Sequence, residues 1–150
     1  MNFTSNRFSN ARRSNGFSLI ELVVAVAIVA ILSMIAVPSF MQNIRESKRT
    51  DAQTALTTAS TNLERFFGAN RTYTTDTTQL GLLIDGGAAY SDDRNYVMTV
   101  AAGGTGIGSS YVVTATAAAG TSQAHDTGCT VLTVSSLGQR TPSPTTSKCW

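Results

Sequence analysis

The chain has 150 residues, of which 42% are apolar and 13% charged, and this length predicts one domain with a core of ordinary size. The formal net charge is +2, but Arg7, Arg12 and Arg13 lie in the first sixteen residues, which contain no acidic side chain. From Phe17 onward, eight basic residues stand against nine acidic ones. The basic balance therefore does not by itself indicate nucleic-acid binding. One histidine and no paired carboxylates or nucleophile arrangement argue against an enzyme.

An apolar stretch follows the basic first sixteen residues. Residues 17–37 are interrupted only by Ser18, Glu21 and Ser33, and as a helix they would reach about 31 Å, enough to cross a hydrocarbon core. The preceding arginines would stay cytoplasmic, which places the C-terminal part outside the inner membrane. A secretory signal is a poor alternative, because residues 36–38 match its cleavage site badly. A plain signal anchor stays open on hydropathy alone.

Glu21 is a carboxylate near the start of this apolar stretch. A charge within a membrane segment costs about 2.5–3.5 kcal/mol at the helix centre and less near an interface. Glu21 therefore either lies at headgroup depth in contact with water, or has a charged partner. The candidate partner is the free amine that cleavage after Gly16 would create at Phe17, on a neighbouring subunit.

The run GFSLIEL at residues 16–22, between a basic leader and an apolar helix, resembles the class III signal of type IV pilins and related pseudopilins. The resemblance implies that a prepilin peptidase removes residues 1–16 by cutting between Gly16 and Phe17. It further implies N-methylation of the Phe17 amine and a role of Glu21 in assembly.

Pro38 also fits the pattern of this family. Proline lacks an amide donor, so a bend or a short melted segment is expected around residues 36–38. Many pilins carry a glycine eight residues earlier, whereas this chain has Ala30 there, a good helix former. The extent of melting between Ala30 and Pro38 therefore stays open.

After Pro38 the apolar residues recur at three- and four-residue steps, which predicts an amphipathic helix. The stripe consists of Phe40, Ile44, Ala52, Ala55, Leu56, Ala59, Leu63, Phe66 and Phe67. A charged group beside the membrane edge is interpreted as a solvated collar; it comprises Arg45, Glu46, Lys48, Arg49 and Asp51. Gly68 is the expected helix stop, so one long helix is predicted over residues 17–67.

Residues 68–150 predict a small head of strands. Three runs are rich in β-branched and aromatic residues, at 95–100, 111–116 and 130–134. The glycine-rich residues 103–108 lack the ending of a phosphate loop and are expected to connect two strands. Gly138 is expected to turn into a short fourth strand, and residues 69–94 to form a loop. The fold class is therefore α+β, with a three- or four-stranded antiparallel sheet packed on the helix.

Cys129 and Cys149 are an even, late pair, which in an exported chain indicates one disulfide. The bridge would close about twenty residues and contribute roughly 3 kcal/mol in the chain-entropy model. A metal site formed by His125, Asp126 and Cys129 is the competing interpretation. These residues supply no complete ligand set, so neither a metal nor another cofactor is expected.

The late cysteine pair that ends in Cys149-Trp150, with the turn LGQRTP at residues 137–142, is similar to small PilE-type minor pilins. This resemblance implies a structural subunit that polymerises through its N-terminal helix and supports twitching motility and adhesion. The implied partners are other pilin subunits, the inner membrane before assembly, and the prepilin peptidase. The implied locations are the inner membrane for the precursor, with its head in the periplasm, and the extracellular fibre after assembly.

Two alternatives share the N-terminal part. One is a type II secretion pseudopilin, although such heads more often rely on a metal-stabilised loop than on a C-terminal bridge. The other is a minor pilin that acts as a DNA receptor in natural transformation, for which Arg94, Arg140 and Lys148 are the candidate head cations. Asp92 and Asp93, beside Arg94, are interpreted as a solvated loop corner.

Overall fold

The computed structural model describes residues 16–142 and 148–150, and the chain divides into two compact units at Pro38. Helix α1 (Leu19–Asn70) contributes to both units. The second unit, Ser39–Trp150, contains the rest of α1 and a six-stranded sheet. The predicted α+β class, with a long N-terminal helix and an antiparallel sheet, is confirmed.

Within the second unit, α1 buries the side of the helix that the apolar pattern predicted. Its buried residues are Arg49, Ala52, Ala55, Leu56, Ala59 and Leu63. The helix runs past the expected stop at Gly68 and ends at Asn70, so that stop was wrong. Arg71 takes the left-handed conformation (φ 60°) that ends the helix, and its amide bonds the Phe67 carbonyl at 2.8 Å.

The sheet is antiparallel throughout, and its strands lie in chain order, β1-β2-β3-β4-β5-β6. The strands are β1 (Leu83–Asp85), β2 (Ala88–Tyr90), β3 (Tyr96–Ala102), β4 (Tyr111–Ala117), β5 (Val131–Ser135) and β6 (Arg140–Thr141). The three predicted strands and the short fourth one correspond to β3, β4, β5 and β6. The glycine-rich segment connects β3 to β4, as the sequence indicated.

The prediction of three or four strands was wrong, because residues 69–94 are not a plain loop. They contain a short 3-10 helix, η1 (Thr77–Leu80), and the hairpin of β1 and β2. Gly86 and Gly87 both have positive φ, at 57° and 84°, the backbone of a two-residue hairpin turn. The pairing of Asp85 with Ala88 closes this hairpin.

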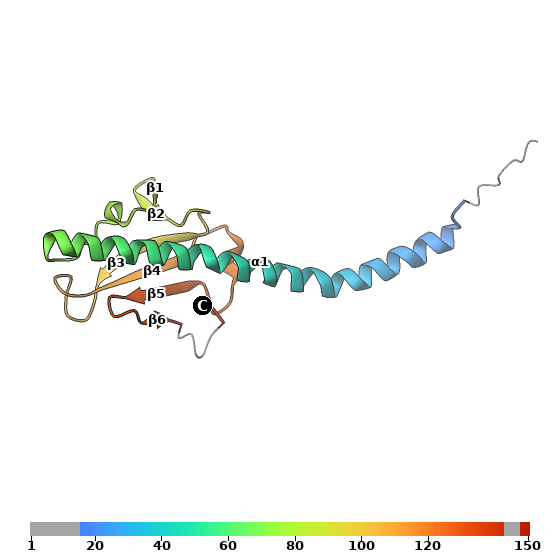
Figure 1. The fold of residues 1–150 in the computed structure, drawn as a ribbon. Helices are drawn as coiled ribbons and strands as arrows, with labels where there is room; N and C mark the ends of the chain where they lie inside the picture. Colours follow the sequence, from blue (N-terminus) through green and yellow to red (C-terminus); the bar gives the residue numbers. More distant parts are fainter. Residues whose placement is uncertain (1–15, 143–147) are drawn as a thin grey trace, which may run out of the picture. The chain divides into compact units, whose positions relative to one another are not determined.

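The core of the second unit lies between α1 and one face of the sheet (Figure 1). Leu56 and Leu63 of the helix are fully buried with residues of the central strands; these are Tyr96, Met98, Tyr111, Val113, Ala115 and Leu132. The alternate residues Tyr111, Val113 and Ala115 of β4 all point to this face. Each buried leucine contributes about 1.5–3 kcal/mol, so this packing holds the second half of α1 on the sheet.

Candidate functional site

The predicted processing site lies at the start of the described chain. Gly16 and Phe17 precede α1, and the first helical hydrogen bond joins the Leu22 amide to the Ser18 carbonyl at 3.1 Å. Phe17 is 84% exposed, and apart from the two chain neighbours of Gly16 no described residue has a heavy atom within 4 Å of the position that a Cβ on Gly16 would take. Glu21 lies in the first turn of α1 and is exposed.

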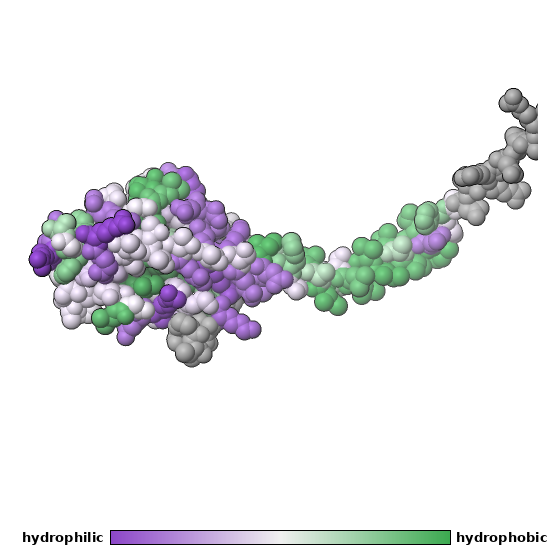
Figure 2. Space-filling model, viewed as in Figure 1, coloured by the Kyte–Doolittle hydropathy of each residue, from purple (hydrophilic) through white to green (hydrophobic). Residues whose placement is uncertain are grey.

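The apolar first part of α1 exposes its side chains to the surroundings. The helix contains an 18-residue window with a mean hydropathy of 2.9, none of it buried, and is long and apolar enough to cross a membrane. Figure 2 shows this apolar surface in green. A helix that is apolar on all sides needs lipid or protein around it.

Pro38 lies inside α1, and the helix is assigned without interruption on both sides of it. Its side chain is exposed, and Ala30 lies in the same helix. The melting of this segment stays a prediction.

A buried polar group at the start of the second unit was not predicted. The Arg49 side chain is 6% exposed and donates two hydrogen bonds of 2.7 Å, from Nε and Nη2, to the two carboxylate oxygens of Asp126. Its Nη1 donates to the Lys148 carbonyl at 2.8 Å. The hydrogen bond from Arg49 to Asp126 and the charge of Asp126 raise the pKa of Arg49, against the lowering effect of burial.

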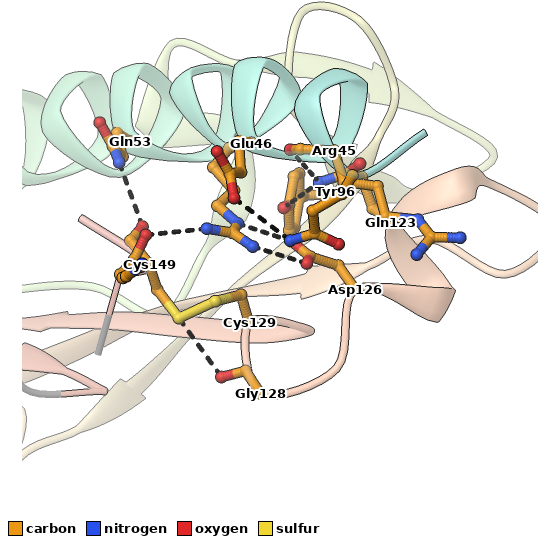
Figure 3. Close-up of a disulfide and its surroundings, with 12 residues drawn as sticks. Arg45, Glu46, Gln53, Tyr96, Gln123, Asp126, Gly128, Cys129 and Cys149 are labelled. Carbon is orange, nitrogen blue, oxygen red and sulfur yellow. Dashed lines mark hydrogen bonds and ion pairs between the residues drawn. A yellow bond between two sulfur atoms is a disulfide. The ribbon is translucent and has the colours of Figure 1, made fainter. Parts of the chain in front are cut away.

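Further polar contacts surround this pair (Figure 3). Gln123 is fully buried and donates to the Tyr96 hydroxyl at 2.8 Å and to the Arg45 carbonyl at 3.2 Å. Gln53 donates to the Cys149 carbonyl at 3.1 Å. We call this group the Arg49 cluster; it consists of Arg45, Arg49, Gln53, Tyr96, Gln123, Asp126 and the carbonyls of Lys148 and Cys149.

The Arg49 cluster corrects the interpretation of Arg45, Glu46, Lys48, Arg49 and Asp51 as a solvated collar. Arg49 is buried, and Asp51 accepts hydrogen bonds from the Asn95 side chain and the Asp93 amide. A signal was present in the sequence. Arg49 falls three residues before Ala52 and seven before Leu56, so it shares the buried stripe, where an arginine needs an acidic partner.

The structure confirms the disulfide between Cys129 and Cys149, whose Cα atoms lie 5.4 Å apart. The bridge connects the segment before β5 with the segment that carries Lys148. Two of the three candidate metal ligands are thereby engaged, because Cys129 is in the bridge and Asp126 in the ion pair.

The three candidate head cations lie in different settings. Arg94 has positive φ (57°) and forms an exposed ion pair with Asp85 at the end of β1, so an acidic side chain offsets its charge. The Arg140 guanidinium lies over the Trp150 ring, 4.9 Å from the centroid. Lys148 is exposed. The structure therefore does not bring the three into one patch through any contact between the described residues.

Comparisons with known proteins match both parts of the chain. Residues 11–37 match the family model of the prokaryotic N-terminal methylation motif. Residues 38–133, more than half of the chain, match the family model described as "Type IV minor pilin ComP, DNA uptake sequence receptor". The two matches meet at Pro38, where the two structural units also divide.

The chain is also similar to individual proteins of pilus and secretion systems. The chain is 35% identical over 91 residues to the type IV major pilin protein PilA of Myxococcus xanthus, covering 61% of this chain and 40% of PilA. It is 28% identical over 85 residues to the type II secretion system core protein G of Dickeya chrysanthemi, covering 57% of this chain and 56% of that protein. The chain thus spans about half the length of the curated relatives it matches. With a methylation motif, a matching head model and the confirmed helix, sheet and disulfide, this chain belongs to the type IV minor pilins.

Proposed function

We propose that the chain is a minor subunit of a type IV pilus that polymerises through residues 17–37. The observation that carries this proposal is the long apolar surface of α1, with no part of its most apolar window buried. Lipid covers this surface in the inner membrane before assembly, and neighbouring subunits cover it in the fibre. In this proposal the folded head lies on the periplasmic side and then on the surface of the fibre, where it supports twitching motility and adhesion.

Maturation supplies the charge that makes assembly selective. Prepilin peptidase cuts between Gly16 and Phe17, and the Phe17 amine is methylated and stays positive. Glu21 of a neighbouring subunit neutralises this amine when both are removed from water. The exposure of Gly16 and Phe17, which lie before the first residue of α1, supports access by the peptidase.

The substitution Glu21→Val tests this proposal. The variant is expected to insert in the membrane and to be processed normally, because it only removes a charge from an apolar segment. It is expected to be depleted in sheared surface fibres at least about tenfold, since the Phe17 amine loses its counter-charge. Immunoblots of sheared fibres and of the cell envelope measure both quantities.

The matched control is Gly16→Val, which is expected to leave an uncleaved precursor in the envelope. Incorporation of Glu21→Val into fibres at the wild-type level would remove the proposed role of this carboxylate. A wild-type protein found only in the envelope would favour a pseudopilin, as in the match to core protein G.

A second candidate function is DNA reception in natural transformation. It is favoured by the match of residues 38–133 to a family model whose description includes a DNA uptake sequence receptor. Of the cations named above, Arg140 and Lys148 are exposed and form no ion pair with another described residue, whereas Arg94 is paired with Asp85.

The full chain in detergent micelles tests this candidate by fluorescence anisotropy with labelled duplex DNA. Binding is expected to weaken steeply with salt, because each phosphate contact releases counterions. Arg140→Gln is expected to weaken binding, whereas Arg94→Gln, which breaks an existing ion pair, serves as the control. Absence of binding at low ionic strength would remove this candidate and leave the pilus subunit unaffected.

A further inference from the structure

We propose that Arg49 positions the two cysteine thiols for oxidation, so that the docking of the C-terminal segment on α1 precedes the disulfide and directs its formation. This inference goes beyond the proposed function, since it concerns how the covalent bond of the head is made. It rests on one guanidinium that contacts the chain segments next to both cysteines. We call these two segments the arms of the disulfide.

The first arm is the segment that leads to Cys129. Arg49 holds the Asp126 carboxylate with two hydrogen bonds of 2.7 Å, and the Asp126 carbonyl accepts the amide of Cys129 at 2.9 Å. The Asp126 residue is 1% exposed. The position of Cys129 therefore follows from the turn that Arg49 fixes.

The second arm is the segment that carries Cys149. The remaining donor of Arg49, Nη1, bonds the carbonyl of Lys148, the residue directly before Cys149, at 2.8 Å. One helical turn further, Gln53 donates to the carbonyl of Cys149 itself at 3.1 Å. These bonds join α1 to backbone groups, so they do not require the sulfur–sulfur bond and are available to the reduced chain.

The geometry of arginine suits this task. Its planar fork presents several donors in fixed directions, so that one side chain bonds a carboxylate at two points and a carbonyl at a third. Lysine offers a single charged point and is unable to reproduce the bidentate contact. The other buried residues of α1 are apolar and pack in the core. This packing fixes the helix backbone at Arg49, so the guanidinium bonds both arms from a fixed position.

The chemical step is a thiol–disulfide exchange. The Cys129 and Cys149 thiols lose two protons and two electrons and form one sulfur–sulfur bond, and a disulfide oxidant is reduced to two thiols. In the test, oxidised glutathione is that oxidant. Arg49 takes no part in the exchange and acts by holding the two thiols close together.

The test measures the effective concentration of one thiol for the other in the purified full chain in detergent, equilibrated in glutathione redox buffers. Free thiols are trapped by alkylation and counted by mass spectrometry. Arg49→Gln is expected to lower the effective concentration about tenfold under native conditions, the effect of losing charge-assisted hydrogen bonds. In concentrated urea, where the arms are released, the variant and the wild type are expected to agree.

Two further variants keep the test decisive. Gln53→Ala removes only the contact with the Cys149 carbonyl and is expected to lower the effective concentration about threefold, even if Arg49→Gln fails to fold. Arg94→Gln removes an exposed ion pair in another loop and is expected to change nothing. An unchanged native effective concentration in Arg49→Gln, or an equal decrease of this variant in urea, would overturn the proposal; if Arg49→Gln does not fold, an unchanged value in Gln53→Ala would overturn it.

Discussion

Tyr73 and Tyr111 share one acceptor, since both hydroxyls donate to the Glu64 carboxylate at 3.2 Å. The Tyr111 residue is 2% exposed, and its ring meets that of Tyr73 edge to face. Burial raises the pKa of Tyr111 to about 12, and the Glu64 charge adds to this effect. The folded head therefore holds the Tyr111 proton more tightly than the unfolded chain does.

The sign of the resulting pH dependence follows from linkage. A folded-state pKa above the unfolded value of about 10 gives stability that is complete below pH 10. This stability is expected to be lost as the pH rises from 10 through about 12. Tyr111→Phe is expected to flatten this decline without abolishing it, because burial also raises the pKa of Tyr73 and Tyr96. Urea titrations at several alkaline pH values measure the effect, and identical pH profiles for the variant and the wild type would contradict it.

At the same scale, the sequence points to residues that stand in one short motif and does not point to contacts between distant parts of the chain. Gly16, Phe17 and Glu21 stand in the seven-residue run that resembles a class III signal, and their roles stay predictions. Arg49 and Asp126 lie 77 positions apart, and no local pattern connects them. Their pairing depends on how the loop before β5 returns to α1, which only the folded chain determines.

Among the secondary-structure elements, the β3–β4 hairpin depends on one close approach of the backbone. The Gly103 amide donates to the Ser110 carbonyl at 3.0 Å. A Cβ on Gly103 would lie 2.8 Å from the Ser110 Cβ and 2.5 Å from its Oγ. A Cβ on Gly104, the next residue, would have no heavy atom of a described residue within 4 Å apart from its two chain neighbours.

Gly103→Ala is therefore expected to destabilise the head by about 1–3 kcal/mol, because the hairpin has to shift to admit a methyl group. Gly104→Ala is the matched control and is expected to stay within about 0.5 kcal/mol of the wild type. The midpoint of urea unfolding of each full-length variant in detergent gives the comparison. Equal destabilisation by the two substitutions would show that the contact with Ser110 is not the cause.

Helices and strands could be predicted from the sequence where their apolar or β-branched residues recur at regular steps. The apolar stripe of α1 and the β-branched runs of β3, β4 and β5 repeat over five or more residues, and the structure contains all of them. The hairpin of β1 and β2 was missed because its strands have three residues each, too few for a clear alternation. Its two-glycine turn was the available signal.

For the molecule as a whole, the disulfide and the hydrophobic core both stabilise the second unit, Ser39–Trp150. The bridge closes a loop with a sequence separation of 20, so the double variant Cys129→Ser/Cys149→Ser is expected to lower the free energy of unfolding by about 3 kcal/mol. The head is expected to stay folded, because the core between α1 and the sheet contains residues remote from the bridge.

The fluorescence of Trp150, the only tryptophan, reports unfolding in urea. Wild-type protein treated with a reductant is the control and is expected to match the double variant. A double variant as stable as the oxidised wild type would show that the bridge adds no constraint beyond the noncovalent contacts of the C-terminal segment.

The strand order β1-β2-β3-β4-β5-β6 has a consequence for biogenesis. Each strand pairs with the one before it, so the pairings are local in the sequence, a property that goes with rapid folding. A head that emerges from a translocation channel in chain order, from α1 toward the C-terminus, can add strands one at a time to the exposed edge of a growing sheet. The contacts of Lys148 and Cys149 with α1 must wait for the end of the chain, so covalent closure is expected to come late in the folding of the head.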